Sequence, residues 1–593
     1  MLQDQSARNQ ATDPRQSFIV QAPAGSGKTE LLTQRFLRLL AVVDAPEQIV
    51  ALTFTRKAAN EMRERILKAL SMAQNQIQAD SEHLKKTLSY AQEALKQDKK
   101  NNWQLLNLPG RLHILTIDSL CQRLNHAIPL QEKQIAYASV CEKPQQYYRQ
   151  AAEDCFNYAL NEPAFQPSLK QLLQHVDNQQ EKLLAFFGDL LTNRDNWIGM
   201  VSTARSLTRD DFETALTWIE QHEINLLHQT LPADIAEELA ALARQMANVE
   251  KDINSPRYEL RNLHSFKALD RSLSKSLAAL LFTSQKSLRK SFDHHVGLKR
   301  GNCTDSEYAI LKEKSKALLL TLGDYPAFQE ALLQVKDLPS PHYDEQQWQT
   351  LQALFALLPL LAASLQVVFS QANTVDFTAI AQQALNALGD EDDPTDLTLY
   401  LDHQIHHLLV DEFQDTSIQQ FQLLSKIVGG WEATDVKTMF LVGDPMQSIY
   451  RFRAAEVGLF LRAKEQGIGP VTLTPLQLSC NFRSTQRIVN WVNSQFKTIF
   501  PQNNDIESGA VSYHASTGIH PESEDSFIKA LALTDANQQA HALVQQVQWE
   551  LNQYPNDTIA ILVRTRNQLT HIMQLLRQFQ IPFQGVEVDP LAG

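Results

Sequence analysis

Residues 16–70 alternate between short apolar runs and amphipathic stretches. Phe18–Val20 and Ile49–Thr53 are apolar runs of the length and composition typical of buried strands. Each run is followed by a stretch in which apolar residues recur at helical spacing, Glu30–Leu40 and Ala58–Leu70. Strands that alternate with helices in this way predict a parallel α/β sheet.

A long middle section breaks this alternation. From about residue 136 to 375, amphipathic stretches rich in Leu, Ala, Gln, Lys and Glu replace the strand patterns, which predicts a large helical insertion. Its most apolar run, 353–363, is too short to span a bilayer and contains Pro359, so we expect a buried helix. A final α/β unit is expected from a strand at 559–564 and a helix near Gln568–Gln578. The other expected strands are Ile114–Ile117, His406–Val410, Thr438–Val442 and Leu473–Leu478.

The composition is that of a folded protein with several domains. Of the 593 residues, 43% are hydrophobic and 20% are charged. The five cysteines show no C-x-x-C spacing, which argues against a disulfide framework or a zinc site and favours a reducing cytosol. The N-terminus is polar, so we expect a cytoplasmic protein that does not contact a membrane. The formal net charge of −13 argues against a basic coat but permits a local nucleic-acid site.

Residues 21–32, QAPAGSGKTELL, place a glycine turn between the first strand and the first helix. Gly25 and Gly27 let the backbone turn tightly, so that its N–H groups and the helix start can bind an anion. Lys28 adds a positive charge for the outer phosphates, and Thr29 adds a hydroxyl for Mg²⁺. The pattern is that of a P-loop; the alternative is an ordinary glycine turn before a helix. The predicted nucleotide-binding residues of this loop are Ala22, Pro23, Ala24, Gly25, Ser26, Gly27, Lys28 and Thr29.

An acidic pair follows the strand at 406–410. In LLVDEFQDT (408–416), Asp411 can hold Mg²⁺, and Glu412 can orient and deprotonate an attacking water. In the loop after the next strand, Gln447 can contact both a terminal phosphate and that water. In LSCNFRST (478–485), Arg483 can stabilise charge on a transferred phosphoryl group. A lone acidic pair after a strand is usually a solvated strand end, so the prediction of catalysis depends on these strings occurring together.

Five strings resemble the motifs of one family. In chain order they are APAGSGKT (22–29), LTFTRKAANEM (52–62), TIDSL (116–120), LLVDEFQDT with GDPMQSIYRFRAA (443–455), and LSCNFRST. Their order and spacing resemble the UvrD/Rep group of superfamily 1 DNA helicases. The APAGSGKTELL opening and the large insertion resemble the RecB/AddA-type helicase-nuclease subunits. The resemblance implies a P-loop NTPase fold with a RecA-like motor domain (1–135 and 376–475), a helical insertion domain (136–375) and a partial second RecA-like domain (476–593).

For ATP, the resemblance assigns roles to single residues. Mg²⁺ would be held by Thr29 and Asp411. The residues with a catalytic role would be Lys28, Glu412 as the base, Gln447 as the phosphate sensor, and Arg483 as an arginine finger. The nucleotide base would lie near Arg35, Phe482 and Gln10, with Gln10 as the glutamine that reads adenine.

For DNA, the resemblance implies two contact segments. Thr53, Phe54 and Arg56 lie in a segment that touches single-stranded DNA, and Tyr450 and Phe452 lie in one that stacks on its bases. Base stacking tolerates any sequence and contributes ~1–3 kcal/mol per base. From pattern alone, core packing remains the alternative for these aromatic residues. The basic stretch 286–300, KSLRKSFDHHVGLKR, is a candidate contact for duplex DNA; the alternative is a solvated face.

The resemblance therefore implies an ATP- and Mg²⁺-dependent DNA helicase or translocase. It would move 3′ to 5′ and act in double-strand break repair and recombination beside a nuclease-bearing partner subunit. Two further motifs of the family's second motor domain, and a nuclease pattern, are not found before Gly593. We therefore expect a C-terminally incomplete chain. The alternative function is that of a polypeptide that binds ATP and DNA without productive turnover.

Overall fold

A six-stranded parallel sheet carries the predicted motifs at its strand ends. The computed structural model describes residues 2–585 apart from 128–137, 142, 201–207, 391–392, 433, 450–454, 507, 523–526 and 534. The strands are β1 (Phe18–Gln21), β2 (Ile49–Thr53), β3 (His113–Thr116), β8 (His407–Val410), β9 (Thr438–Gly443) and β10 (Thr474–Gln477). Their order is β10-β1-β9-β8-β2-β3, and every neighbouring pair is parallel. The predicted α/β fold and these six predicted strands are confirmed.

Alternate residues of each strand pack on opposite faces of the sheet. Ile19 and Leu408 belong to the hydrophobic cluster on one face, whereas Val20 and Leu409 belong to the cluster on the other. Because helices cover both faces, the strands read as continuous apolar runs. The first face is covered by α5 (Ile117–Ala127), α15 (Phe377–Ala387) and α17 (Ile418–Val428). The second is covered by α2 (Lys28–Leu40), α3 (Arg56–Gln74) and α4 (Glu82–Asn101).

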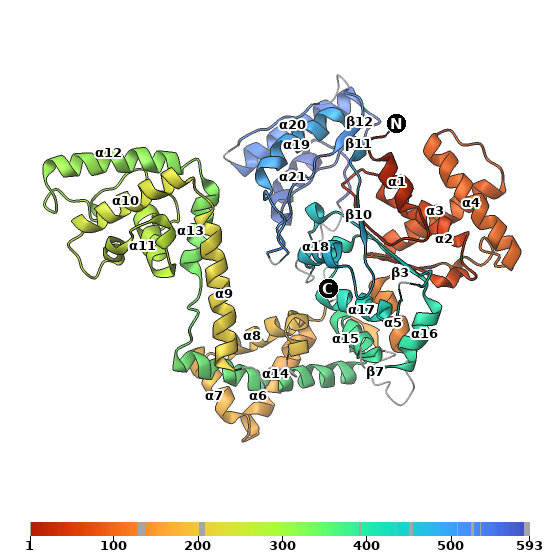
Figure 1. Ribbon diagram of the computed structural model, residues 1–593, viewed down its shortest axis with the longest axis horizontal. Coiled ribbons are helices and arrows are strands. Elements are labelled where there is room, and N and C mark those ends of the chain that lie inside the picture. The colour runs from red at the N-terminus through yellow and green to blue at the C-terminus, as the bar shows by residue number, and fades with distance from the viewer. Residues whose placement is uncertain are drawn as a thin grey trace.

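The inserted segment is helical, as predicted, and has two parts. Its helices are α6 (Gln145–Asn161), α7 (Gln166–His175), α8 (Gln180–Thr192), α9 (Arg209–His228), α10 (Ala233–Val249), α11 (Arg271–Leu281), α12 (Asp305–Leu322), α13 (Pro326–Asp337) and α14 (Glu345–Ala372). The helices α6, α7, α8 and α14 share the core of the first sheet face. The long helix α9 leads from them to α10–α13, which have a hydrophobic cluster of their own (Figure 1). We call this outer group the arm.

Helix α14 contains the apolar run 353–363 and extends well beyond it. Pro359 lies inside this helix and does not end it. Among the described residues, α14 is the one helix long and apolar enough to cross a membrane: it has 28 residues, and an 18-residue stretch of it has a mean hydropathy of 2.1. Leu357, Leu361 and Leu365 are nevertheless buried in the protein core, and α14 packs against α6 and α7. A buried core helix is what the sequence predicted.

A smaller unit follows the sheet. Its strand β11 (Cys480–Thr485) pairs in parallel with β12 (Thr517–His520). Its helices are α19 (Gln486–Ile499), α20 (Ala536–Gln553) and α21 (Leu569–Gln578), so the helix expected near 568–578 is confirmed. The strand expected at 559–564 is wrong: Leu562 is 93% exposed, and no described strand pairs with this segment. Its apolar side chains Ile561 and Val563 instead pack against α20 and α21.

Candidate active site

The glycine turn between β1 and α2 has the conformation of a phosphate-binding loop. Gly25 and Gly27 have φ angles of 75° and 79°, in the left-handed region that favours glycine. Gly27 is the N-cap of α2, so the loop ends at unpaired helical N–H groups that attract anions. A Cβ on Gly25 would lie 2.8 Å from Asn481 Oδ1, so space also requires glycine there. Ser26 Oγ is buried and has no hydrogen-bond partner among the described residues, which suits a loop built to receive a ligand.

Lys28 lies beside the two carboxylates at the end of β8. Its Nζ is 2.5 Å from Glu412 Oε1 and 3.7 Å from Asp411 Oδ1. Burial raises the pKa of Asp411 to about 6, whereas the positive charge of Lys28 opposes this shift. Glu412 has a φ of 53°, a left-handed conformation that residues other than glycine adopt rarely. The structure therefore brings the predicted lysine, metal ligand and base together.

Gln414 connects the acidic pair to the loop after β9. Its Nε2 donates to Glu412 Oε2 at 2.8 Å and to Asp415 Oδ2 at 3.1 Å. Its Oε1 accepts the backbone N–H of Asp444 at 2.9 Å. The predicted phosphate sensor Gln447 lies in the same loop and donates to the Asp444 carboxylate. The sequence analysis did not single out Gln414, although an amide two residues beyond the predicted base was a usable signal.

The segment that leads into the smaller unit lies directly on the P-loop. The backbone N–H of Phe482 donates to Gly25 O at 2.8 Å, and Asn481 Nδ2 donates to Ala24 O at 3.0 Å. A Cβ placed on Gly27 would lie 3.9 Å from the nearest carbon of the Phe482 ring. Arg483 is exposed, and its Cβ lies 2.8 Å from the place that a Cβ would take on Gly25. Phe482 and Arg483 are thus at the nucleotide loop, where the sequence placed them; Asn481 was missed.

Helix α1 (Gln5–Ala11) reaches the P-loop through Arg8 rather than Gln10. Arg8 Nη2 donates to Ser26 O at 2.7 Å, and the guanidinium lies 5.2 Å from the centre of the Phe482 ring. The side chain of Gln10 is exposed, and among the described residues no hydrogen bond joins it to the loop. The resemblance implies a glutamine at this place, whereas the residue that contacts the P-loop is the arginine two positions before Gln10.

The prediction that Arg35 lies near the nucleotide base is wrong. Arg35 is 0% exposed, on the side of α2 that packs against the sheet. Its guanidinium donates to Gln16 O at 2.8 Å and to Thr438 Oγ1 at 3.1 Å, and it lies 5.3 Å from the centre of the Phe440 ring. Burial lowers its pKa to about 9. Arg35 therefore ties the connection between α1 and β1 to the sheet.

The predicted DNA segment after β2 lies at the same edge of the sheet as the P-loop, because all six strands are parallel. Phe54 is half-buried, and Arg56 is exposed at the start of α3. Thr53 requires a correction: it is buried, and its Oγ1 donates to the backbone oxygen of Thr55 at 3.1 Å. Its side chain therefore shapes the turn after β2. Tyr450 and Phe452 lie outside the described residues.

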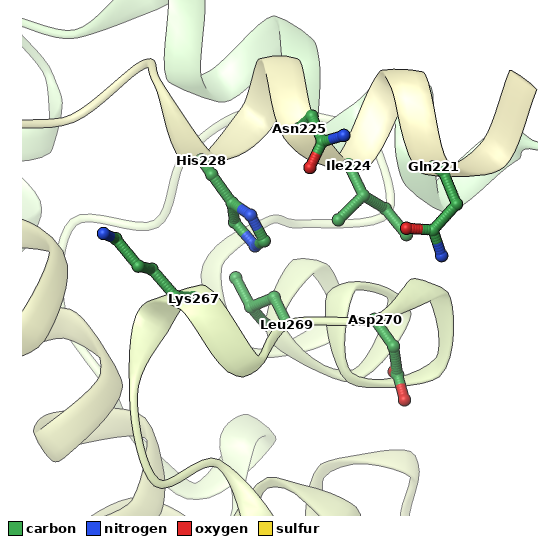
Figure 2. Close-up of a pocket in the computed structure, with 7 residues that line it drawn as sticks. All are labelled: Gln221, Ile224, Asn225, His228, Lys267, Leu269 and Asp270. Atoms are coloured by element: carbon green, nitrogen blue, oxygen red, sulfur yellow. The ribbon is translucent and has the colours of Figure 1, made fainter. Parts of the chain in front are cut away.

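A surface pocket at the junction of α9 and the arm contains none of the predicted site residues. It lies between α9 and the chain leading into α11 (Figure 2). Asp270, on its rim, is the N-cap of α11, and burial lowers the pKa of His228 on the opposite wall. The lining residues are Gln221, Ile224, Asn225, His228, Lys267, Leu269 and Asp270. The chemistry expected of a phosphate site is therefore at the sheet edge and not in this pocket.

The fold and the site define the class of P-loop NTPases: a parallel sheet with a phosphate loop after β1 and an acidic pair after β8. Family models are more specific. The model described as the UvrD/REP helicase N-terminal domain matches residues 3–467, and the UvrD-like helicase C-terminal domain matches residues 476–590. The chain therefore belongs to the UvrD/REP helicase family, as its motifs predicted.

The similar proteins include helicase-nuclease subunits. An ATP-dependent helicase/nuclease subunit of Staphylococcus aureus (strain MRSA252) is 25% identical over 616 residues, which cover 96% of this chain and 47% of the relative. The corresponding protein of Desulfitobacterium hafniense (strain DCB-2) is 26% identical over 543 residues, covering 87% of this chain and 37% of the relative. The chain thus spans less than half the length of these relatives. The resemblance to helicase-nuclease subunits is confirmed.

Proposed function

We propose that this chain is the motor of an ATP-dependent DNA helicase or translocase that moves 3′ to 5′. The process would be double-strand break repair and recombination. The observation that carries the proposal is the chain of contacts from Lys28 through Glu412 and Gln414 to the loop of Gln447. These contacts support a site in which ATP binding or hydrolysis changes the position of the loop after β9. That loop continues into the predicted DNA-stacking segment at 450–452.

The residues at the sheet edge fit ATP and Mg²⁺. Bound Mg-ATP supplies the phosphoryl group and a Lewis acid at its oxygens. Hard oxygen ligands suit Mg²⁺, and Thr29 and Asp411 provide a hydroxyl and a carboxylate for it. Lys28 binds the outer phosphates, which leaves Glu412 Oε1 to accept the proton of the attacking water. Gln414 holds Glu412 Oε2 and so fixes the direction of the other oxygen.

From the side of the smaller unit, Phe482 and Arg483 complete the ATP site. Phe482 presents a flat face to the nucleotide base, and the Arg483 guanidinium stabilises charge on the transferred phosphoryl group. Gln447 senses the terminal phosphate. These assignments are supported by the hydrogen bond between the Phe482 N–H and Gly25 O, which places the segment on the P-loop.

DNA contacts are proposed at two places. Phe54 and Arg56 face single-stranded DNA at the sheet edge, with Tyr450 and Phe452 stacking on its bases. On the arm, Lys299 and Arg300 are exposed and contact duplex phosphates. The names of the similar proteins combine helicase and nuclease activity in a subunit, which supports DNA repair by this protein beside a nuclease-bearing partner subunit. The place of this activity would be the cytoplasm.

A second candidate function is binding of ATP and DNA without productive turnover. One observation favours it. Among the described residues, the smaller unit contributes to the P-loop only through the segment at 481–483, and its sheet has only the strands β11 and β12. A motor needs charge-stabilising groups from both sides of the nucleotide.

ATP turnover with and without single-stranded DNA separates the two candidates. We expect DNA-stimulated hydrolysis that Glu412→Gln abolishes, with nucleotide binding retained. Glu465→Gln is the matched control, since Glu465 is an exposed acid on α18 (Val457–Gln466). ATP binding without turnover in the wild type would favour the second candidate, and absence of ATP binding would refute both.

A further inference from the structure

Asp4, just before α1, binds the start of the smaller unit. Its Oδ2 accepts the backbone N–H groups of Ser479 and Cys480, each at 3.0 Å. These two residues lie where the chain passes from β10, the last strand of the large sheet, into β11, the first strand of the smaller unit. Asp4 is only 5% exposed. An N-terminal carboxylate therefore holds the point at which the chain passes from one unit to the other.

Arg8, one helical turn later, binds the P-loop. Its Nε and Nη2 grip both oxygens of Asp4, at 2.8 and 2.9 Å, and Nη2 also donates to Ser26 O at 2.7 Å. The same guanidinium covers one face of the Phe482 ring. The guanidinium of Arg8 thus contacts three groups: the P-loop at Ser26, the carboxylate of Asp4, and the ring of Phe482.

The electrostatics of this pair are those of a permanent ion pair. Burial alone would raise the pKa of Asp4, but hydrogen bonds from Arg8 and the backbone N–H groups outweigh it and lower the pKa to about 2. Asp4 therefore stays ionised at any pH well above 2. A bidentate arginine–carboxylate pair is geometrically rigid, unlike a lysine contact. Thr517 Oγ1 on β12 also donates to Gln3 Oε1 at 2.8 Å, a further contact between the N-terminal segment and the smaller unit.

We infer that Asp4 and Arg8 are positioning residues that set how the smaller unit docks on the nucleotide loop. Through Ser479 and Cys480 they fix the start of β11, and hence the placing of Phe482 and Arg483 against Gly25 and Gly27. The inference rests on the proposed ATP-dependent function. We assign neither Asp4 nor Arg8 a contact with the nucleotide. Both act through the segment 481–483, to which we assign that contact.

The test measures nucleotide affinity and stability separately. The full chain is titrated with the fluorescent nucleotide N-methylanthraniloyl-ADP in the presence of Mg²⁺, at a temperature where circular dichroism shows every variant folded. The variants are Arg8→Ala, Arg8→Lys and Asp4→Asn. Arg15→Ala is the matched control, because it removes the same charge from an exposed side chain of the same N-terminal segment.

We expect Arg8→Ala and Asp4→Asn to raise the dissociation constant about fivefold or more, and Arg8→Lys to give an intermediate value. Lysine keeps the charge and one donor to Ser26 O but loses the bidentate grip on Asp4. Arg15→Ala should bind as the wild type does. Wild-type affinity in Arg8→Ala, or equal losses in Arg8→Ala and Arg8→Lys with equally lowered melting temperatures, would overturn the inference and leave ATP binding intact. Failure of the wild type to bind the nucleotide would instead refute the proposed function, and the inference with it.

Discussion

Replacing Gly443 by alanine should shift the predicted base Glu412, although the new methyl group would not contact Glu412 itself. A Cβ at this position would clash with Gln414 Oε1. It would also lie 3.1 Å from the backbone nitrogen of Gln414 and 3.1 Å from a ring carbon of Phe460. The carboxamide must therefore move. Gln414 is only 2% exposed, so its side chain has little room to move. Any movement breaks the hydrogen bond that its Oε1 accepts from the Asp444 N–H at 2.9 Å, and the one that its Nε2 donates to Glu412.

The size of the effect follows from those contacts. A buried N–H left without an acceptor costs about 1–3 kcal/mol. Overpacking of a tight core costs a similar amount, and the two overlap because one movement relieves the clash and breaks the bond. We therefore expect Gly443→Ala to destabilise the sheet unit by roughly 2–4 kcal/mol, and to lower its melting temperature by roughly 5–10 °C. A positioned general base contributes about 10²–10⁴ in rate, so ATP turnover should fall at least about tenfold.

The assay is a double-mutant cycle. Melting temperature and DNA-stimulated ATP turnover are measured for Gly443→Ala, Gln414→Ala and the pair. Gly301→Ala is the control, since a Cβ there meets nothing within 4 Å. Because Gln414→Ala removes the obstructing oxygen, adding Gly443→Ala to it should cost much less than in the wild type. Equal costs in both backgrounds, or wild-type behaviour of Gly443→Ala, would refute the link from Gly443 through Gln414 to Glu412.

Three further predictions concern the core and the arm. Burial lowers the pKa of His407 to about 3, whereas an unfolded histidine titrates near 6.5; stability present above pH 6.5 is therefore lost as pH falls towards 3. By pH 4.5 this loss is ~3 kcal/mol, and urea melts at pH 7.5 and 4.5 should show a smaller loss in His407→Asn. Arg35→Ala should destabilise the protein by about 3–5 kcal/mol in the same melts, since it leaves buried carbonyl groups unpaired beside a cavity; a change below about 1 kcal/mol would contradict its structural role. Changing Lys290, Lys299 and Arg300 to glutamine should weaken the salt dependence of duplex binding. The slope of log K against log salt concentration should fall in magnitude by about 0.9 for each phosphate that is no longer neutralised. An unchanged slope would exclude binding of duplex DNA by the arm.

Much of the fold could be predicted because it depends on local pattern. The residues Phe18–Val20 and Ile49–Leu52 are apolar on both faces, as strands buried between helices must be, and the strands appear where expected. The failure at 559–564 shows the limit of this reasoning. An apolar run is compatible with a strand, but a strand exists only where a neighbour supplies backbone partners, and the described chain supplies none there.

The residues of the candidate site likewise fall into those that local sequence identified and those that it did not. Gly25, Gly27 and Lys28 were found from sequence because a phosphate loop is one contiguous stretch, and the acidic pair directly follows its strand. Arg35 was misplaced because its role was taken from the family resemblance. Leu31, Leu32 and Leu39 lie three or four residues from it, so helical spacing already puts Arg35 on the apolar face of its helix. Its polar partners, by contrast, come from distant segments and cannot be seen in the local sequence.

The sequence by itself determined the class of this protein, since the motif chemistry and the strand–helix alternation are encoded within a few residues of one another. Only the tertiary structure decided which groups meet across long separations: Gln414 with Asp444, Phe482 with Gly25, and Asp4 with Ser479. The physical reason is that a hydrogen bond requires atoms about 3 Å apart. No pattern along the chain specifies that distance until the sheet has brought its strand ends to one edge.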